Sequence, residues 1–347
     1  MLPTNIVKMD ELSSPSQIIW RGFEGETDYQ KILTIIQACT PVDSLERADT
    51  LENITNTYSH LVNCDPLHDM LFAEVNGQTV GYCRLWWEIS GAGEWIGFIL
   101  GYVHPAFRGQ GIGSRFLTFQ ENRLKTISAK MLAEGKISTD AHCYADAWLE
   151  EGEKAREGLL IGAGYHPERY EYHMVRSLAE PLEILPLPAG LEIRPVLPEH
   201  YRQVWDAATE AFRDHWGYIP PSDEYYQQWL EDPNFDPGLF RVAWDGEQVA
   251  GMVQNFLQPE ENVKYGRKRG YTEGICVRRP WRKRGLARSL LTHSMQMFKD
   301  MGMQETALSV DTQNLNGANR IYESVGYRIV SHMTLYRKEL VDLEKSL

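Results

Sequence analysis

Hydrophobic and polar positions follow two different periods along this chain, which predicts strands interleaved with helices. The apolar run Trp95–Val103 is about half as long as the ~18 residues of a membrane span, so it predicts a buried strand. Five later apolar residues recur at helical spacing: Leu286, Leu290, Leu291, Met295 and Phe298. This stripe predicts a helix with one face against a sheet. We therefore expect an α/β fold of α+β layers, with helices on a mixed sheet.

The same order of landmarks occurs twice. Two hairpin patterns with Asn-Gly or Asp-Gly turns lie at 71–82 and 239–252. Two strands that end in glycine-rich turns lie at 101–113 and 275–287, and two Gly-Tyr pairs lie at 164–165 and 326–327. Three landmarks in one order at nearly one spacing predict a duplicated domain. Each copy is expected to run strand, one or two helices, hairpin, long strand, turn, helix, strand, helix, strand.

The boundary between the copies is also visible. Residues 178–190 carry three prolines and a glycine without an amphipathic period, which is typical of a semi-rigid linker. We predict an N-terminal domain at 1–178, a linker at 179–190 and a C-terminal domain at 191–347. Strands at 18–23 and from Leu191 should open the two copies. At 347 residues the chain suits two domains of roughly 150 residues each.

Composition restricts the class of partner. The chain is 43% hydrophobic and 24% charged, and its net charge of −13 gives a pI near 5.3. These values indicate a folded globular protein and disfavour nucleic acid or a membrane surface as partner, because both attract excess cationic charge. The first residues lack the apolar core of a signal peptide. Scattered cysteines without a Cys-x-x-Cys pair predict reduced structural thiols, no metal site and a cytoplasmic location: Cys39, Cys64, Cys83, Cys143 and Cys276.

Each glycine-rich turn joins a strand to a helix, at Arg108–Gly113 and at Arg282–Ala287. Small residues let backbone approach a ligand, and the free N–H groups of a helix start can hold phosphate oxygens. Neither turn has the pattern of a dinucleotide fingerprint or a nucleoside-triphosphate loop. A solvated basic turn is the alternative interpretation. Cationic residues crowd the second turn and its flanks: Lys264, Arg267, Lys268, Arg269, Arg278, Arg279, Arg282, Lys283, Arg284 and Arg288.

Both turns fit Arg-x-x-Gly-x-Gly/Ala after a Val-x-Pro or Val-x-x-Pro, and the second copy adds Asn314…Tyr322…Gly326-Tyr327. In these motifs the chain resembles the GNAT superfamily of acetyl-CoA-dependent N-acetyltransferases, in its tandem, mycothiol-synthase-like branch. The resemblance implies two GNAT-type domains, each a mixed, mostly antiparallel sheet flanked by helices. It also implies acetyl-CoA as cosubstrate without a metal, with the turn holding the coenzyme pyrophosphate.

The resemblance assigns the coenzyme to two sets of residues. In the second copy these are Cys276, Val277, Arg282, Lys283, Arg284, Gly285, Leu286, Ala287, Arg288 and Asn314. A second possible site comprises Val103, Arg108, Gly109, Gln110, Gly111, Ile112 and Gly113.

Acyl transfer to an amine needs a base for the ammonium, hydrogen-bond donors for the thioester oxygen and an acid for the departing thiolate. Glu273 is the candidate base, on the strand that ends at Val277 and, by alternation, on the face of Ile275 and Val277. Tyr322 is the candidate acid, and backbone N–H near Val277 is the expected oxygen donor. The alternatives are a solvent-facing glutamate and a core tyrosine. Cys276 is a possible nucleophile, although a strand cysteine is more often a small buried hydrophobe.

The first copy departs from this pattern. Alignment on the valine puts Ile99 at the Glu273 position, and alignment on Gly164 puts Leu160 and Gly152 at the Tyr322 and Asn314 positions. We therefore expect the N-terminal copy to keep a pyrophosphate turn and to be catalytically silent.

The acceptor is expected near the end of the first helix of the second copy, where Asp214, His215, Trp216 and Tyr218 cluster. A helix end whose aromatics pack on the other copy explains them equally well. The predicted function is acetyl transfer from acetyl-CoA to a primary amine of a small molecule or peptide, in the C-terminal domain of a monomer or homodimer. The alternative is a coenzyme-A-binding sensor or scaffold without turnover.

Overall fold

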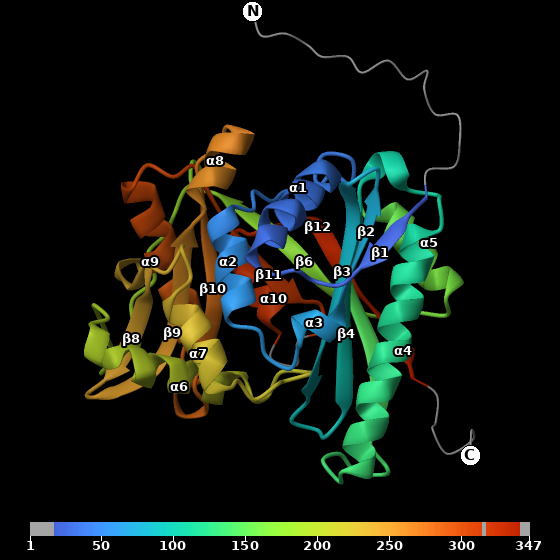
Figure 1. The fold of residues 1–347 in the computed structure, drawn as a ribbon. Coiled ribbons are helices and arrows are strands. Elements are labelled where there is room, and N and C mark those ends of the chain that lie inside the picture. Colours follow the sequence, from blue (N-terminus) through green and yellow to red (C-terminus); the bar gives the residue numbers. More distant parts are fainter. Residues whose placement is uncertain (1–16, 314–316, 341–347) are drawn as a thin grey trace, which may run out of the picture.

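A computed structural model describes residues 17–313 and 317–340 of the chain (Figure 1). The first copy comprises β1 (Ile19–Arg21), α1 (Tyr29–Cys39), α2 (Leu51–Ser59), α3 (Pro66–Asp69), β2 (Met70–Val75), β3 (Gln78–Ile89), β4 (Trp95–Val103), α4 (Ile112–Ala133), β5 (Cys143–Glu150), α5 (Lys154–Gly162) and β6 (His166–Ser177). The second comprises β7 (Glu192–Arg194), α6 (Tyr201–Phe212), α7 (Asp223–Leu230), β8 (Arg241–Asp245), β9 (Gln248–Leu257), α8 (Pro259–Tyr265), β10 (Arg269–Val277), α9 (Leu286–Asp300), β11 (Glu305–Asp311), α10 (Ala318–Ser324) and β12 (Arg328–Glu339). The predicted element order occurs in both copies with two short additions, α3 before the hairpin of the first copy and α8 between the hairpin and the long strand of the second. The predicted fold class is confirmed.

The two copies share one twelve-stranded sheet through an exchange of their last strands. The strand order is β1-β2-β3-β4-β5-β12-β6-β11-β10-β9-β8-β7. β12, from the second copy, pairs with β5, and β6, from the first copy, pairs with β11. The green β6 and the red β12 lie side by side at the centre of the sheet (Figure 1). Each copy therefore completes its sheet with the last strand of the other.

Helices cover both faces of the sheet because each presents an apolar stripe to it. In the first copy Ile32 and Ile35 of α1 pack with Phe72 on one face, while Leu124 of α4 packs with Trp95 on the other. The second copy repeats this arrangement with α6 and α9. The predicted stripe of α9 is confirmed, since all five of its residues are buried. The copies also meet on one face, where His60 of α2 contacts Glu224 of α7 (Nδ1–Oε1, 2.6 Å).

Each copy contains one parallel strand pair that diverges. β10 pairs with β11 only from Arg269 to Tyr271, although β10 continues to Val277 and β11 to Asp311. β4 and β5 likewise pair only from Trp95 to Phe98. Beyond these segments the strands lose backbone contact, so each copy has a cleft at the carboxyl end of its central strands, next to its glycine-rich turn.

Candidate active site

A cavity of about 790 Å³ occupies the cleft between β10 and β11, and we call it the front cavity. It brings together the candidate base, the candidate acid and the glycine-rich turn: Glu273, Ser309, Tyr322, Gly285, Leu286, Ala287 and Arg288. The side chains come from four elements that meet only because the two strands diverge. The front cavity is therefore the candidate active site.

A β-bulge shapes the wall of this cavity. The register of β10 against β9 shifts between Glu273 and Cys276, so Gly274 and Ile275 lie outside the regular pairing. Gly274 has a φ of +57°, which L side chains rarely adopt. A bulge takes backbone N–H groups out of the sheet ladder and leaves them free for a ligand. The sequence predicted donors for the thioester oxygen near Val277, on the same strand and closer to its end.

The bulge also corrects the expectation from strand alternation. Ile275 and Val277 pack with Leu286 and Leu290 on the α9 side of the sheet. Glu273 is paired with Gln254, and Cys276 with Met252, so Glu273 shares its face with Cys276, which packs on the α6 side. The extra residue breaks the two-residue period between Glu273 and Ile275, so the prediction that Glu273 shares a face with Ile275 and Val277 was wrong.

Glu273 has the environment of a general base. Its Oε1 accepts a hydrogen bond from the backbone N–H of Ser309 on β11 (2.9 Å). Burial, together with the negative charge of Glu171, raises the pKa of Glu273 to about 7 against the opposing effects of Ser309 and His173. A carboxyl group with a pKa near neutrality can both accept and release a proton at physiological pH.

Tyr322 lies on α10 in the same cavity and is buried. Burial, followed by the nearby Glu273 carboxylate, raises the pKa of its phenol, which therefore stays protonated at neutral pH. A protonated phenol can donate to a departing thiolate. The turn that follows α10 needs its glycine, because a Cβ on Gly326 would lie 2.4 Å from Nε of Arg176, a residue of the exchanged strand β6.

The glycine-rich turn forms an open seat at the start of α9. Gly285 is the N-cap residue with a φ of +86°, and a Cβ added there would have no neighbour within 4 Å. Arg282 points away from the seat: it donates to the Val277 carbonyl oxygen (Nε–O, 2.9 Å) and pairs with Asp214 (2.7 Å). It also donates to the Ala211 carbonyl oxygen (3.1 Å) and so anchors the turn to the end of α6, while the exposed Lys283 and Arg288 line the front cavity beside the turn.

The cationic cluster of the sequence divides in the structure. Arg267 and Arg269 lie at the opposite end of β10 and pair with Glu46 of the first copy (2.5 and 3.1 Å). Arg278 pairs with Glu210 (2.7 Å), and Arg279 pairs with Asp214. Proximity in sequence overestimated the charge available to a phosphate, because five of these ten cations, Arg282 included, already have carboxylate partners.

The predicted acceptor cluster also divides. Asp214 is bound to Arg279 and Arg282, which lower its pKa far below the usual range. Trp216 lies against Arg169 of β6 and Arg337 of β12 (4.5 and 5.0 Å from guanidinium carbon to ring centroid). The Tyr218 carbonyl oxygen accepts from the N–H of Gly91 in the first copy (2.7 Å). Of these four residues, His215 lines the front cavity.

Cys276 is buried, and burial raises the pKa of its thiol to about 12. A thiol that remains protonated is a poor nucleophile, so its environment is that of a structural cysteine. All five cysteines are free. Asn314, the remaining predicted coenzyme contact, lies outside the described residues.

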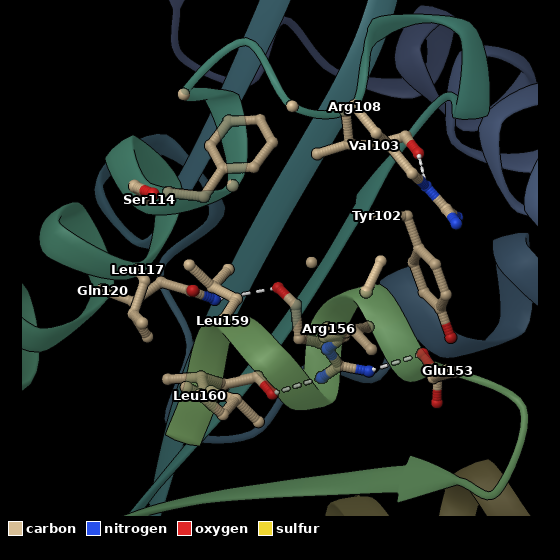
Figure 2. A pocket seen from close by; sticks show the side chains of 18 of the residues that line it. Tyr102, Val103, Arg108, Ser114, Leu117, Gln120, Glu153, Arg156, Leu159 and Leu160 are labelled. Carbon is tan, nitrogen blue, oxygen red and sulfur yellow. Dashed lines mark hydrogen bonds and ion pairs between the residues drawn. The ribbon is translucent and has the colours of Figure 1, made fainter. Parts of the chain in front are cut away.

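The first copy has a corresponding cavity of about 540 Å³, which includes all the residues of the second predicted site except Gln110 and Ile112. Arg108 anchors this turn as Arg282 does the other, through the Val103 carbonyl oxygen (3.1 Å) and Asp43 (2.7 Å). Inside the cavity lies Arg156, beside Glu153 (Figure 2). Its guanidinium donates to the carbonyl oxygens of Ile99 on β4 and Trp148 on β5 (3.3 and 3.4 Å).

The cleft of the first copy is therefore bridged by a cation where the second copy holds a carboxylate. β4 also pairs with β3 along its whole length and has no bulge. Gln254 is the register partner of Glu273, and the repeated hairpin aligns Gln254 with Arg84 of the first copy. Because β4 has no bulge, the register partner of Arg84 is Leu100. The alignment of Ile99 with Glu273 was therefore wrong by one residue, and the position is apolar in either case.

Sequence reasoning missed the residues of β6 that reach the second site. Glu171 lines the front cavity, and His173 contacts Ser309, although both belong to the first copy. The repeat assigns β6 to its own copy, and only the strand exchange brings it to the other. The Glu-x-His spacing on a strand is a weak signal that nothing in the sequence connects to Glu273.

Two whole-chain observations concern other site types. No helix in residues 17–313 or 317–340 combines the length and the apolar character needed to cross a bilayer. The same described residues contain no group of three or more His, Cys, Asp or Glu side chains arranged to hold a metal ion.

Known proteins resemble the chain in both copies. Sequence models of the acetyltransferase (GNAT) family match residues 201–327, and models of the acetyltransferase (GNAT) domain match residues 66–146. Mycothiol acetyltransferase from Thermobispora bispora is 27% identical over 237 residues, which cover 68% of this chain and 74% of that protein. The enzyme of the same name from Salinispora arenicola is 24% identical over 316 residues and covers 88% and 92%.

Two solved structures share the fold. A GCN5-related N-acetyltransferase from Sphaerobacter thermophilus superposes with a TM-score of 0.66 at 24% identity, over 94% of this chain and 98% of that one. A tandem GNAT protein from the clavulanic acid biosynthesis pathway superposes with a TM-score of 0.63 at 12% identity, over 94% and 99%. In both cases the likeness extends across the two copies.

Proposed function

Since this chain belongs to the GNAT family, as a tandem-GNAT acetyltransferase, we propose that its C-terminal copy moves the acetyl group of acetyl-CoA directly to a primary amine of a small molecule. The observation that carries this proposal is the convergence of Glu273, Tyr322 and the open turn at Gly285 on one cavity. The N-terminal copy, with Arg156 across its cleft, is catalytically silent.

The residues of the front cavity fit each step of direct transfer. Glu273 removes a proton from the acceptor ammonium, so that the nitrogen lone pair can attack the thioester carbon. The N–H groups of the bulge stabilise the oxygen as charge develops on it. The carbon–sulfur bond then breaks, and Tyr322 donates its proton to the thiolate of coenzyme A. The second proton of the acceptor nitrogen returns to the Tyr322 phenolate, so that one proton per turnover stays on Glu273. The coenzyme pyrophosphate lies on the first turn of α9, beside Lys283 and Arg288.

The acceptor side is acidic. Glu171 lines the front cavity, and its burial raises the pKa of its carboxyl group. Asp311 also lines the cavity and is paired with Arg169 (2.6 Å). A bound ammonium would favour the ionised form of Glu171, so the two groups would stabilise each other. The relatives named for mycothiol favour a small molecule over a peptide as acceptor.

The test is an amine panel with acetyl-CoA, in which free coenzyme thiol and product mass are both measured. We expect thiol release only when amine is present, and a product heavier by one acetyl group. Glu273→Gln combined with Tyr322→Phe should lower kcat by at least about 10²-fold. Full activity in this double variant would refute the assignment of the site. Binding of acetyl-CoA without turnover of any amine would favour a sensor.

A matched pair of variants identifies the active copy. Arg288 and Ser114 occupy the same exposed position on the first turn of α9 and α4, beside the respective cavities. Arg288→Glu should raise KM for acetyl-CoA about tenfold by repelling phosphate, whereas Ser114→Glu should leave it unchanged. The opposite result would assign catalysis to the N-terminal copy.

A further inference from the structure

Glu273 lies between two cavities. On one side is the front cavity, and on the other is a second cavity of about 680 Å³, which we call the back cavity. Glu273 and Ser309 line both. The back cavity is otherwise lined in part by the first copy, including His173 on β6 and Glu150 at the end of β5. Glu273 is thus accessible from two sides, only one of which holds the glycine-rich turn.

A row of hydrogen-bonding groups leads away from Glu273 along the back cavity. Ser309 donates its N–H to Glu273 (2.9 Å), which places its hydroxyl next to the same carboxyl group, and both groups of Ser309 lower the pKa of Glu273. The same hydroxyl Oγ lies 3.0 Å from Nδ1 of His173. On the far side of the ring, Nε2 lies 3.0 and 3.2 Å from the two carboxylate oxygens of Glu150. The Glu150 side chain is 38% exposed, so the row ends at solvent.

The chemistry of the front cavity requires such an exit. Each turnover leaves one proton on Glu273, and that carboxyl group must ionise again before the next. Acceptor and coenzyme occupy the front cavity during the reaction, which closes that side to water. An imidazole can accept a proton on one nitrogen and release one from the other near neutral pH. The hydrogen bond to Glu150 raises the pKa of His173, which favours proton uptake by the ring.

We propose that Ser309, His173 and Glu150 form a proton relay that discharges Glu273 into the back cavity after each turnover. This inference rests on the proposed role of Glu273 as base. The Glu273 proton moves to Ser309 Oγ while the hydroxyl proton moves to Nδ1 of His173. The Nε2 proton then passes to Glu150 and from there to water. Rotation of the hydroxyl, and exchange of the ring proton from Nδ1 to Nε2 through water in the back cavity, restore the starting state. No atom is gained or lost.

The relay gives the first copy a role in the chemistry of the second. His173 reaches Ser309 only because β6 pairs with β11, with the two residues in direct register. The ionisable groups that face His173 are Glu150, Glu171 and Glu273. All three are acidic, so the cationic ring is an accessible intermediate. His173 and Glu150 act through Ser309 and are positioning residues, because neither lines the front cavity.

The test compares His173→Asn and Ser309→Ala with the wild-type chain in the thiol-release assay. We expect kcat to fall at least about tenfold in both, with KM for acetyl-CoA unchanged and a larger solvent deuterium isotope effect. Added imidazole should restore kcat of His173→Asn in a concentration-dependent manner by entering through the back cavity. His332→Asn is the matched control, since His332 lies on neighbouring β12 and faces Glu151 (3.4 Å). It should keep wild-type kcat.

The outcomes separate the relay from the proposed function. If Glu273→Gln is inactive while His173→Asn keeps wild-type kcat, the base is right and the relay is wrong. If Glu273→Gln is fully active, the proposed function itself fails. A loss of kcat in His173→Asn that imidazole does not restore, together with a lower Tm, would show a purely structural role and overturn the relay. Glu150→Gln should give a smaller loss of kcat that mobile buffer bases compensate.

Discussion

At the scale of single residues, the environment of Glu273 matters most. Burial raises its pKa from an ordinary 4.5 to about 7, so the carboxyl group is half ionised near neutrality. The direction has two consequences. Activity should depend on pH through this group. The free energy of unfolding should fall as pH rises above the ordinary pKa of a glutamate, because the unfolded chain ionises there and the folded chain does not.

The first prediction concerns activity. Because only ionised Glu273 can accept a proton, kcat should rise with pH and level off above a pKa of about 7. The measurement is a profile of kcat against pH with two acceptor amines of different basicity. The rising limb should stay near pH 7 for both amines, and should disappear in Glu273→Gln. A limb that moves with the amine would assign the titration to the acceptor.

The second prediction concerns stability. Between about pH 4.5 and 7 the folded state binds the Glu273 proton more tightly than the unfolded state, so the free energy of unfolding falls as pH rises through this window. Glu273→Gln removes the effect and should be more stable than wild type by about 2–3 kcal/mol at pH 8, with a much smaller difference at pH 4. Urea denaturation at the two pH values measures this, and an equal difference at both would contradict it.

At the scale of elements, the bulge in β10 distinguishes the two copies. It frees backbone groups at Gly274 and Ile275 next to Glu273, while β4 pairs regularly throughout. The two strands otherwise have the same length and follow the same hairpin. One additional residue in β10 is therefore enough to leave backbone N–H groups free for a ligand, whereas β4 has no such residue and keeps its regular pairing.

The third prediction follows from the bulge. A Cβ on Gly274 would lie 3.0 Å from the Gln254 side chain, on a backbone with a φ of +57°. Gly274→Ala should lower the free energy of unfolding by about 1–3 kcal/mol and, by flattening the bulge, reduce kcat about tenfold.

Gly101→Ala is the matched control in β4, where φ is ordinary and the nearest contact is Cβ of Cys83 at 3.3 Å. It should leave kcat unchanged. Equal losses of kcat in the two variants would show that the effect is one of sheet stability rather than of the bulge.

At the scale of the whole molecule, the exchange of β6 and β12 makes the two copies one cooperative unit. Buried ion pairs tie each exchanged strand to its host: Arg337 of β12 binds Asp146 of β5 (2.7 Å), and Arg169 of β6 binds Asp311 of β11 (2.6 Å). Both guanidinium groups lie against Trp216. If one copy unfolds, the sheet of the other copy loses the strand that was exchanged into it.

The fourth prediction tests this coupling. Arg337→Met leaves Asp146 buried without its partner and should cost about 3–5 kcal/mol. Loss of activity at the distant C-terminal site should follow the same urea curve as tryptophan fluorescence, because unfolding is a single transition.

Arg328→Met, on the same strand but with an exposed side chain that pairs with Glu180 (3.1 Å), is the control and should cost less than about 0.5 kcal/mol. Two separate transitions in wild type would contradict the coupling.

The sequence predicted much of the fold and part of the candidate site. Local patterns sufficed for the two hairpins, the strand at Trp95–Val103 and the α9 stripe, because each depends on a period within one element. They failed at the bulge, where one unpaired residue invalidated the alternation used to place Glu273. It also invalidated the alignment that put Ile99 at the equivalent position of the first copy. They also missed His173, because pairing between distant strands leaves no local period.

The proposed silence of the N-terminal copy has a consequence for how this gene can change. Duplication ordinarily leaves a redundant segment that can be lost without harm. Here such a loss would remove β6, the strand that adjoins the cleft containing Glu273. The two copies can therefore change only as a pair, because the N-terminal copy supplies a strand beside the proposed active site.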